Sequence, residues 1–329
     1  MLTAIDAAGE FRDRIDDRVE FEELGIRRTR YAALALLRLI RRARPRVLFS
    51  TLTRVNMLLL GLRCVLPERP RIVIRQPTMP ARDLTNLRPR WIYRLLYPRL
   101  LGAADVIVSQ SAVMTTSLRR HVRPGLARVV TIGNPAPDAD WAALRSLPSP
   151  FEAGTNFLCV GRLSAEKGQD VLLDAFALAL QRLSAIRLTF VGQGPLADPL
   201  KAQAERLGIA DRVSFAGFCP DPGVYLAHAD ALVLPSRWEG FPNALLEAIS
   251  AGIPVVATEC DGVSAEIVQP GINGYLVPTE DPAAMAEAML RVLGLRSQGA
   301  EPIRQTIDRF RSERIMAAYR EVLLGLAAP

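Results

Sequence analysis

The sequence predicts an α/β protein with two doubly wound, parallel-sheet domains. Short apolar runs that are typical of buried strands alternate with amphipathic helical segments along the chain. The length of 329 residues is about twice that of a typical domain. A proline-rich stretch at residues 135–150 separates the strands into two sets, so we expect a linker there.

Most of the predicted strands are continuously apolar, which is the pattern of strands buried on both faces of a parallel sheet. The chain opens at MLTAID, which reads as a second strand already under way. The other strands of the first set are expected at 19–24, 47–51, 71–76, 105–111 and 129–134. The second set is expected at 157–163, 188–193, 213–218, 231–236, 254–258 and 275–278.

Helical segments with one apolar face separate these strands. Residues 30–44 place apolar side chains on one stripe and arginines on the other. The segments 170–183 and 196–208 have the same kind of pattern, and the second of them ends on a glycine that is suited to a C-cap. A long helical pattern at 306–326 follows the last strand. Repeated strand and helix units of this kind predict doubly wound sheets.

Composition excludes several classes of protein. Half of the residues are hydrophobic and 23% are charged, which excludes a disordered chain. No apolar stretch approaches 18 residues, so we expect no membrane-spanning helix, and the N-terminus lacks the order of a signal peptide. The cysteines are too far apart to indicate a zinc site or a disulfide framework, so we expect a cytoplasmic protein. They are Cys64, Cys159, Cys219 and Cys260.

Charge is distributed unevenly along the chain. Residues 1–150 contain 26 arginines, no lysine and 13 acidic residues, for a net charge of +13, whereas residues 151–329 have a net charge of −6. Two interpretations stay open: a general bias toward arginine, or a first half that faces an anionic partner. A membrane surface or a lipid phosphate fits better than nucleic acid, because no nucleic-acid-binding motif is present and aromatic residues are not interleaved with the arginines.

The strongest motif is EGFPNALLE at residues 239–247, between a predicted strand and an apolar helix. A helix N-terminus near Asn243 offers free N–H groups that suit a phosphate, and Gly240 permits close approach of the backbone. Glu247 is expected in the first helical turn, where its carboxylate can accept hydrogen bonds from two sugar hydroxyls. Glu239 is expected on the loop at the ligand side. The alternative is a capping carboxylate at 247 and a solvated loop residue at 239.

A second motif, GRLSAEKG at residues 161–168, lies between a predicted strand and a predicted helix. Arg162 and Lys167 can therefore both project from the carboxyl edge of the sheet, where α/β proteins bind ligands. Two cations beside a helix N-terminus suit a diphosphate. Lys167 is one of only two lysines, so the bias toward arginine does not account for it. The alternative is a pair of solvated surface cations.

A third motif is Gly192-Gln-Gly194, again directly after a strand. It lacks the spacing of a dinucleotide-binding fingerprint, and no acidic residue ends the next strand, which argues against NAD. Phe218, at the end of that next strand, is placed to stack on a nucleobase, although such an aromatic residue is more often part of the core.

The motifs VGRLSAEKG, VGQGP, FAGF, LPSRWEGFPNALLEAISAGIPVVAT and GINGYLVP together resemble glycosyltransferase family 4 over residues 155–285. The first half is less similar, although IGNPAP resembles the family's segment that enters the linker. The resemblance implies the GT-B fold, with two Rossmann-like domains facing a cleft. It also implies a retaining reaction without a metal ion or other cofactor, in which the nucleotide-sugar donor binds the second domain and the acceptor binds mainly the first.

The resemblance also implies roles for individual residues. Arg162 and Lys167 would hold the donor diphosphate, Glu247 would bind the ribose, Glu239 would lie against the donor sugar and Phe218 would lie near the base. The catalytic residues predicted in this way are Arg162, Lys167 and Glu239. The predicted donor-binding residues are Gly161, Gly192, Gly194, Phe218, Gly240, Phe241, Asn243, Ala244, Leu245 and Glu247.

We therefore expect an acceptor-side domain at 1–134, a linker at 135–150, a sugar-nucleotide-binding domain at 151–305 and a C-terminal helix at 306–329 that packs back toward the first domain. Members of the family begin with a strand, a glycine-rich loop and a helix. The opening at MLTAID therefore predicts that the first βα unit of the N-terminal domain is missing.

The function predicted from this resemblance is transfer of a sugar from a nucleotide-sugar, with UDP as the expected nucleotide, to a lipid-linked or polysaccharide acceptor in cell-surface glycan synthesis. The expected location is cytoplasmic or peripheral at the inner face of the plasma membrane, with an anionic membrane surface and no nucleic acid as partner. Two alternatives remain open: an inactive donor-binding module of the same fold, and a sugar-nucleotide epimerase.

Overall fold

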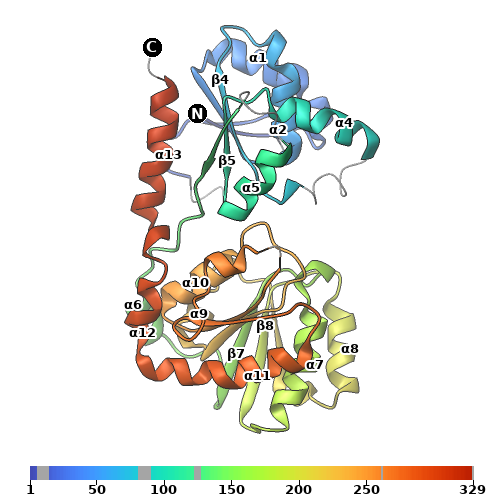
Figure 1. The fold of residues 1–329 in the computed structure, drawn as a ribbon, viewed down its shortest axis with the longest axis vertical. Helices are drawn as coiled ribbons and strands as arrows, with labels where there is room; N and C mark the ends of the chain where they lie inside the picture. Colours follow the sequence, from blue (N-terminus) through green and yellow to red (C-terminus); the bar gives the residue numbers. More distant parts are fainter. Residues whose placement is uncertain (6–14, 81–89, 122–126, 261, 328–329) are drawn as a thin grey trace. The chain divides into compact units, whose positions relative to one another are not determined.

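A computed structural model of the chain describes two compact units (Figure 1). The description covers all residues except 6–14, 81–89, 122–126, 261 and 328–329. Unit 1 contains Met1–Gln110, Met114–Thr131 and Tyr319–Pro329, and unit 2 contains Ser111–Val113 and Ile132–Ala318. All strand pairs in both units are parallel, as the continuous apolar runs predict.

Unit 1 contains two separate parallel sheets. The smaller sheet pairs β1 with β2, and the larger has the order β3-β4-β5-β6. Each strand overlaps a segment that the sequence predicts as a strand, including β1 in the opening segment, although β2 has the sequence Phe-Glu-Glu and is not an apolar run. The strands are β1 (Leu2–Ala4), β2 (Phe21–Glu23), β3 (Val47–Ser50), β4 (Arg71–Arg75), β5 (Val106–Ser109) and β6 (Arg128–Thr131). The helices are η2 (Thr29–Tyr31), α1 (Ala33–Ala43), α2 (Thr53–Leu62), η3 (Arg63–Val65), α4 (Arg90–Leu101) and α5 (Ala112–His121).

A cavity of about 1010 Å³ is lined by residues of both sheets of unit 1. The N–H of Arg71 donates to the carbonyl of Arg46, so the residues of β3 that hydrogen-bond to β4 are the even-numbered ones. The N–H and C=O groups of Val47 and Phe49 therefore point away from β4, toward the other edge of β3. Among the described residues, β3 pairs only with β4 and β1 pairs only with β2, so the other edge of each of these two strands has no strand beside it. The sheet of unit 1 is therefore divided in two.

The acidic residue Asp105 connects three elements of unit 1. Its side chain is 11% exposed and accepts hydrogen bonds from Arg63 at 2.7 Å, from Arg71 at 3.0 Å and from the N–H of Ile72 at 2.8 Å. Burial opposes ionisation of this carboxyl, but the hydrogen bonds and the charge of Arg63 hold its pKa below the ordinary value. Asp105 thereby joins η3 and the start of β4 to the residue that precedes β5.

Unit 2 contains one six-stranded parallel sheet in the order β12-β11-β10-β7-β8-β9. The chain runs outward from β7 through β8 to β9 and then returns to β10 on the other side of β7. The switch point of the topology therefore lies between β7 and β10. The strands are β7 (Thr155–Val160), β8 (Ile186–Val191), β9 (Val213–Gly217), β10 (Ala231–Leu234), β11 (Val255–Thr258) and β12 (Gly274–Val277).

The helices of unit 2 enclose a core of buried aliphatic and aromatic side chains, to which β7, β8, α7 and α11 contribute. Their bounds are α6 (Trp141–Ser146), η4 (Ala165–Lys167), α7 (Gln169–Leu180), α8 (Ala197–Arg206), η5 (Ala210–Arg212), α9 (Gly223–His228), α10 (Asn243–Ala251), η6 (Ser264–Glu266), α11 (Pro282–Val292), η7 (Leu293–Gln298), α12 (Ala300–Gln305) and η8 (Asp308–Phe310). The last helix, α13 (Ser312–Ala327), belongs to unit 2 as far as Ala318 and to unit 1 from Tyr319. No helix in the described part of the chain has the length and the apolar character that a membrane span needs.

Two details differ from the sequence-based expectations. The predicted linker 135–150 contains α6, because Asp140 caps this helix by accepting the N–H of Ala143 and the prolines lie outside it. The helical pattern at 306–326 is not one helix: η8 ends at Phe310 and α13 begins at Ser312.

We predict that Asp105→Asn lowers the free energy of unfolding by about 1.5–3 kcal/mol at neutral pH, because charge-assisted hydrogen bonds are lost. The folded-state pKa of Asp105 is lowered, so the stabilisation is complete above the ordinary value of 3.8 and is lost as the pH falls through the folded-state pKa. Denaturant unfolding of both proteins as a function of pH measures this. The control is Asp198→Asn, since Asp198 is 96% exposed. Equal losses for the two variants would contradict the assignment.

Candidate functional site

The three motifs meet at the carboxyl edge of the sheet of unit 2. The loop after β7 contains Arg162 and Lys167, the loop after β8 contains Gly192, and the loop after β10 contains Glu239. Because β7 and β10 are neighbours in the sheet, the first and third of these loops flank the switch point between the strands. This is the position at which open α/β sheets bind ligands.

The glycines of the second and third motifs pack these loops against each other. The N–H of Gly192 donates to the carbonyl of Gly217 at 2.7 Å, and a Cβ at Gly192 would overlap the carbonyl of Gly161. A Cβ at Gly194 would likewise overlap the carbonyl of Leu163. Close packing of the loops thus accounts for these two glycines without a ligand.

Lys167 and Glu239 form an ion pair across the switch point. Lys167 Nζ lies 2.7 Å from Glu239 Oε1, and the hydroxyl of Ser236 donates to the same oxygen at 2.6 Å. The side chains are 23% and 7% exposed, so the alternatives of a solvated cation at 167 and a solvated acid at 239 are wrong. Arg162 is exposed, and its guanidinium makes no hydrogen bond or ion pair with the described residues.

The buried thiol of Cys159 lies on β7 beneath this pair. Burial, opposed by the charge of Lys167 and aided by that of Glu239, raises the pKa of the thiol to about 12. Cys159 is therefore a neutral core residue at physiological pH and supplies no nucleophile to the site.

Helix α10 begins at Asn243, four residues after Glu239 on the loop that follows β10. Pro242 precedes the helix and supplies no side-chain cap. The N–H groups of Asn243 and Leu245 donate to the carbonyls of Phe241 and Pro242, both at 3.0 Å. No hydrogen bond of the N–H of Ala244 is present among the described residues, so this amide is available to an anion.

Glu247 lies in the second turn of α10, so the prediction of a first-turn carboxylate is wrong. The helix begins at Asn243, and its N-terminal end is therefore one turn away from the carboxylate. Burial, followed by the negative charge of Asp221, raises the pKa of Glu247 above its ordinary value. Its carboxylate makes no hydrogen bond or ion pair with the described residues, so this half-buried acid can accept hydrogen bonds from a ligand.

The two predicted aromatic residues differ in their surroundings. Phe218 follows β9 and is 48% exposed, so the alternative of a core residue is wrong for it. Phe241 is buried and packs edge-on against Phe310, with ring centroids 5.8 Å apart. Phe241 therefore anchors the loop before α10, and Gly240 beside it is half-buried.

Sequence reasoning missed three residues around the site. Ser236 supports Glu239, and Asn134 donates to the side-chain oxygen of Asn243 at 2.6 Å. Arg237 binds Asp170 through two hydrogen bonds of 2.8 and 2.7 Å, and this pairing and a second one with Glu280 hold the pKa of Arg237 above its ordinary value. Their residue types were visible in the sequence, but their partners lie far away along the chain.

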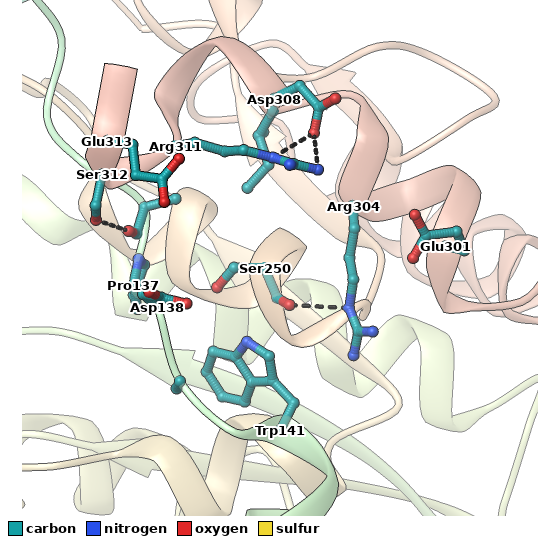
Figure 2. A pocket seen from close by; sticks show the side chains of 13 residues that line it. Pro137, Asp138, Trp141, Ser250, Glu301, Arg304, Asp308, Arg311, Ser312 and Glu313 are labelled. Atoms are coloured by element: carbon teal, nitrogen blue, oxygen red, sulfur yellow. Dashed lines mark hydrogen bonds and ion pairs between the residues drawn. The ribbon is translucent and has the colours of Figure 1, made fainter. Parts of the chain in front are cut away.

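A pocket of about 320 Å³ lies elsewhere in unit 2 and contains none of the predicted site residues (Figure 2). Its polar groups are largely engaged. Arg304 donates to the carbonyl of Ser250 at 3.0 Å, Arg311 donates to Asp308 at 2.9 Å, and Ser312 donates to a backbone carbonyl at 3.0 Å. We therefore interpret this pocket as a gap in the packing between the segment before α6 and the segment that joins α12 to α13, and not as a ligand site.

Parts of this chain are similar to known proteins. Residues 154–294 match the family model described as glycosyl transferases group 1. The amylovoran biosynthesis glycosyltransferase AmsK of Erwinia amylovora is 31% identical over 205 residues, which are 60% of this chain and 49% of AmsK. The lipopolysaccharide core biosynthesis glycosyltransferase LpsE of Rhizobium meliloti is 33% identical over 181 residues, which are 54% of this chain and 52% of LpsE. This chain spans about half the length of these two relatives.

Solved structures show the same fold over most of the chain. Anabaena Alr3699/HepE, solved in complex with UDP, has a TM-score of 0.75 at 21% identity and covers 89% of this chain and 82% of its own. The lipopolysaccharide outer core galactosyltransferase WaaB has a TM-score of 0.70 at 19% identity, covering 96% and 88%. Together with the parallel sheets of both units, this confirms the expected GT-B fold.

We predict that Glu247→Gln raises the free energy of unfolding at neutral pH. Because the folded-state pKa is raised, folding disfavours the ionised carboxylate, and this penalty operates above the folded-state pKa and vanishes below the ordinary value of 4.5. Thermal unfolding of both proteins between acid and neutral pH measures it. Glu205→Gln on the exposed face of α8 is the control. A variant less stable than the wild type at neutral pH would show that the carboxylate has a stabilising partner.

Proposed function

We propose that this chain, whose residues 154–294 belong to the glycosyl transferases group 1 family, is a retaining glycosyltransferase. It would move a sugar from a nucleotide-sugar, with UDP as the nucleotide, to a lipid-linked or polysaccharide acceptor in cell-surface glycan synthesis. The observation that carries this proposal is the Lys167–Glu239 ion pair at the switch point of the sheet of unit 2.

The pair suits a diphosphate for a simple reason of hydrogen bonding. An ammonium group has three donors, and Glu239 occupies one of them, so two remain for phosphate oxygens. The buried carboxylate fixes the position of the ammonium before the ligand arrives. Arg162 adds an unpaired, planar guanidinium from the same loop, which suits two phosphate oxygens at once. The unused N–H of Ala244 offers a further donor.

These groups would act on the leaving group of the transfer reaction. The bond between the sugar carbon C1 and the diphosphate oxygen breaks, and negative charge accumulates on the departing diphosphate. Cations that are already in place stabilise that charge in the transition state. The acceptor hydroxyl then forms its bond to C1 from the face that the diphosphate leaves, and its proton passes to a phosphate oxygen. In this scheme Glu239 lies against the donor sugar and holds Lys167.

Two further residues support a nucleotide-sugar as donor. The carboxylate of Glu247 has no partner among the described residues, and two hydroxyls of a ribose would satisfy both of its oxygens. Phe218, at the end of β9, is exposed and offers a ring face to a base. UDP is the nucleotide bound in the HepE structure, and amylovoran and lipopolysaccharide core are the products of the pathways named for AmsK and LpsE.

An inactive donor-binding module is the second candidate, and the divided sheet of unit 1 favours it. The resemblance assigns acceptor binding mainly to the first domain. Unit 1 has two separate sheets, and a cavity of about 1010 Å³ is lined by residues of both. If this division removes the acceptor site, only donor binding by unit 2 remains. Calorimetry that shows nucleotide-sugar binding, combined with the absence of turnover on lipid-linked and polysaccharide acceptors, would support this candidate over the transferase.

We predict that Lys167→Ala weakens UDP binding by about 10- to 150-fold, because a charge-assisted hydrogen bond contributes about 1.5–3 kcal/mol. Calorimetric titration with UDP, GDP, ADP and their sugars measures the effect and identifies the base. The matched control is Lys201→Ala, the chain's only other lysine, which is 54% exposed on α8. Retention of wild-type UDP affinity by Lys167→Ala would refute the assignment.

A double variant separates direct binding from an indirect effect. Lys167→Ala leaves the carboxylate of Glu239 buried and unpaired, and this charge alone could repel a diphosphate. Lys167→Ala combined with Glu239→Gln removes both charges. If Lys167 contacts the diphosphate, the double variant still binds UDP weakly. Recovery of affinity in the double variant would show that the lysine only neutralises Glu239.

A further inference from the structure

The arginines of unit 1 are concentrated around α1. Residues 25–46 contain eight arginines and no acidic residue. Of these arginines, Arg27, Arg28, Arg38, Arg41, Arg42, Arg44 and Arg46 are exposed. A cluster of this size on an amphipathic helix is the pattern of a segment that binds anionic lipid headgroups.

The two faces of α1 have different surroundings. Leu36, Leu39 and Ile40 are buried against the core of unit 1. The opposite stripe carries Leu34, Arg38 and Arg41 at the spacing of one helical face. The helix therefore has an inner face that is fixed to the fold and an outer face that is free for another surface.

The positive charge on and next to α1 is only partly compensated by the protein itself. Arg42 pairs with Glu22, and Arg44 lies 3.5 Å from Glu68. Arg38 and Arg41 make no ion pair or hydrogen bond with the described residues. These two guanidinium groups leave a positive charge that an anionic partner would neutralise.

Large apolar side chains adjoin the arginines at the N-terminal end of α1. Leu34 is 68% exposed, and Tyr31, in the short helix η2 immediately before α1, is 64% exposed. Leucine and tyrosine beside arginine are typical of a helix that lies in the plane of a membrane interface, with the apolar groups below the headgroups and the arginines among the phosphates. A nucleic-acid backbone would use the arginines but gives no role to an exposed leucine.

We propose that the outer face of α1, defined by Leu34, Arg38 and Arg41, binds the surface of an anionic phospholipid bilayer together with Tyr31 of η2. The inference rests on the proposed function in one respect, namely that the acceptor is lipid-linked. The outer face of α1 would then be the surface that brings the enzyme to its acceptor. Binding to lipid is measurable without donor or acceptor, so its failure and the failure of the proposed function are distinguishable.

The experiment is co-sedimentation of the full chain with vesicles of phosphatidylcholine alone and with vesicles of equal parts phosphatidylcholine and phosphatidylglycerol. Binding is expected only to the anionic vesicles and is expected to fall with added salt. Each basic residue near such a surface contributes about fivefold in affinity, so Arg38→Glu/Arg41→Glu weakens binding by at least about 25-fold. Leu34→Ser weakens it with less dependence on salt.

Control variants change the same residue types in unit 2. Arg206→Glu/Arg314→Glu reverses two exposed arginines, and Leu178→Ser replaces a leucine that is 40% exposed on α7. Both controls should bind vesicles like the wild type, and thermal unfolding should show that all four variants are folded. The proposal is overturned by equal binding to both kinds of vesicle, by wild-type binding of the α1 double variant, or by preferential binding to a DNA duplex added as competitor.

Discussion

The ion pair between Lys167 and Glu239 is the interaction on which the candidate site depends. It joins the loops after β7 and β10, the two neighbouring strands at which the topology of the unit 2 sheet reverses. A charge pair in this position is expensive to bury, and Ser236 offsets part of the cost by donating to the same carboxylate oxygen. Glycines in the adjacent loops allow these loops to pack closely against each other. The ammonium of Lys167, the guanidinium of Arg162 and the start of α10 are therefore held at the carboxyl edge of the sheet.

The strands of this protein could be predicted from the sequence because almost all of them are parallel strands of a buried sheet. Such strands are apolar on both faces, so each is a continuous run that interrupts the helical periodicity, and even the opening segment proved to be β1. The position of the site could be predicted for a related reason. Loops that follow parallel strands all emerge at one edge, so the motifs after β7, β8 and β10 had to lie near one another.

The pairing of charges could not be predicted, because it depends on residues far apart in the chain. Nothing in the sequence distinguishes Arg162, which remains exposed and unpaired, from Arg237, which is held by Asp170 and Glu280. The sequence placed the start of α10 near Asn243, where the helix does begin, but residue 247 is four positions further on and therefore lies in the second turn. The consequence is chemical: one turn further in, Glu247 is a partly buried acid with a raised pKa rather than a carboxylate stabilised by a helix end.

The scarcity of lysine permits a direct measurement of the central claim, which is that Lys167 binds the donor diphosphate. The chain has only two lysines, so an amine-reactive reagent followed by peptide mass spectrometry reports on Lys167 and on Lys201 in the same sample. The account predicts that UDP slows modification of Lys167 and leaves the rate at Lys201 unchanged. Saturating UDP that leaves the rate at Lys167 unchanged, or slows both lysines alike, would contradict it.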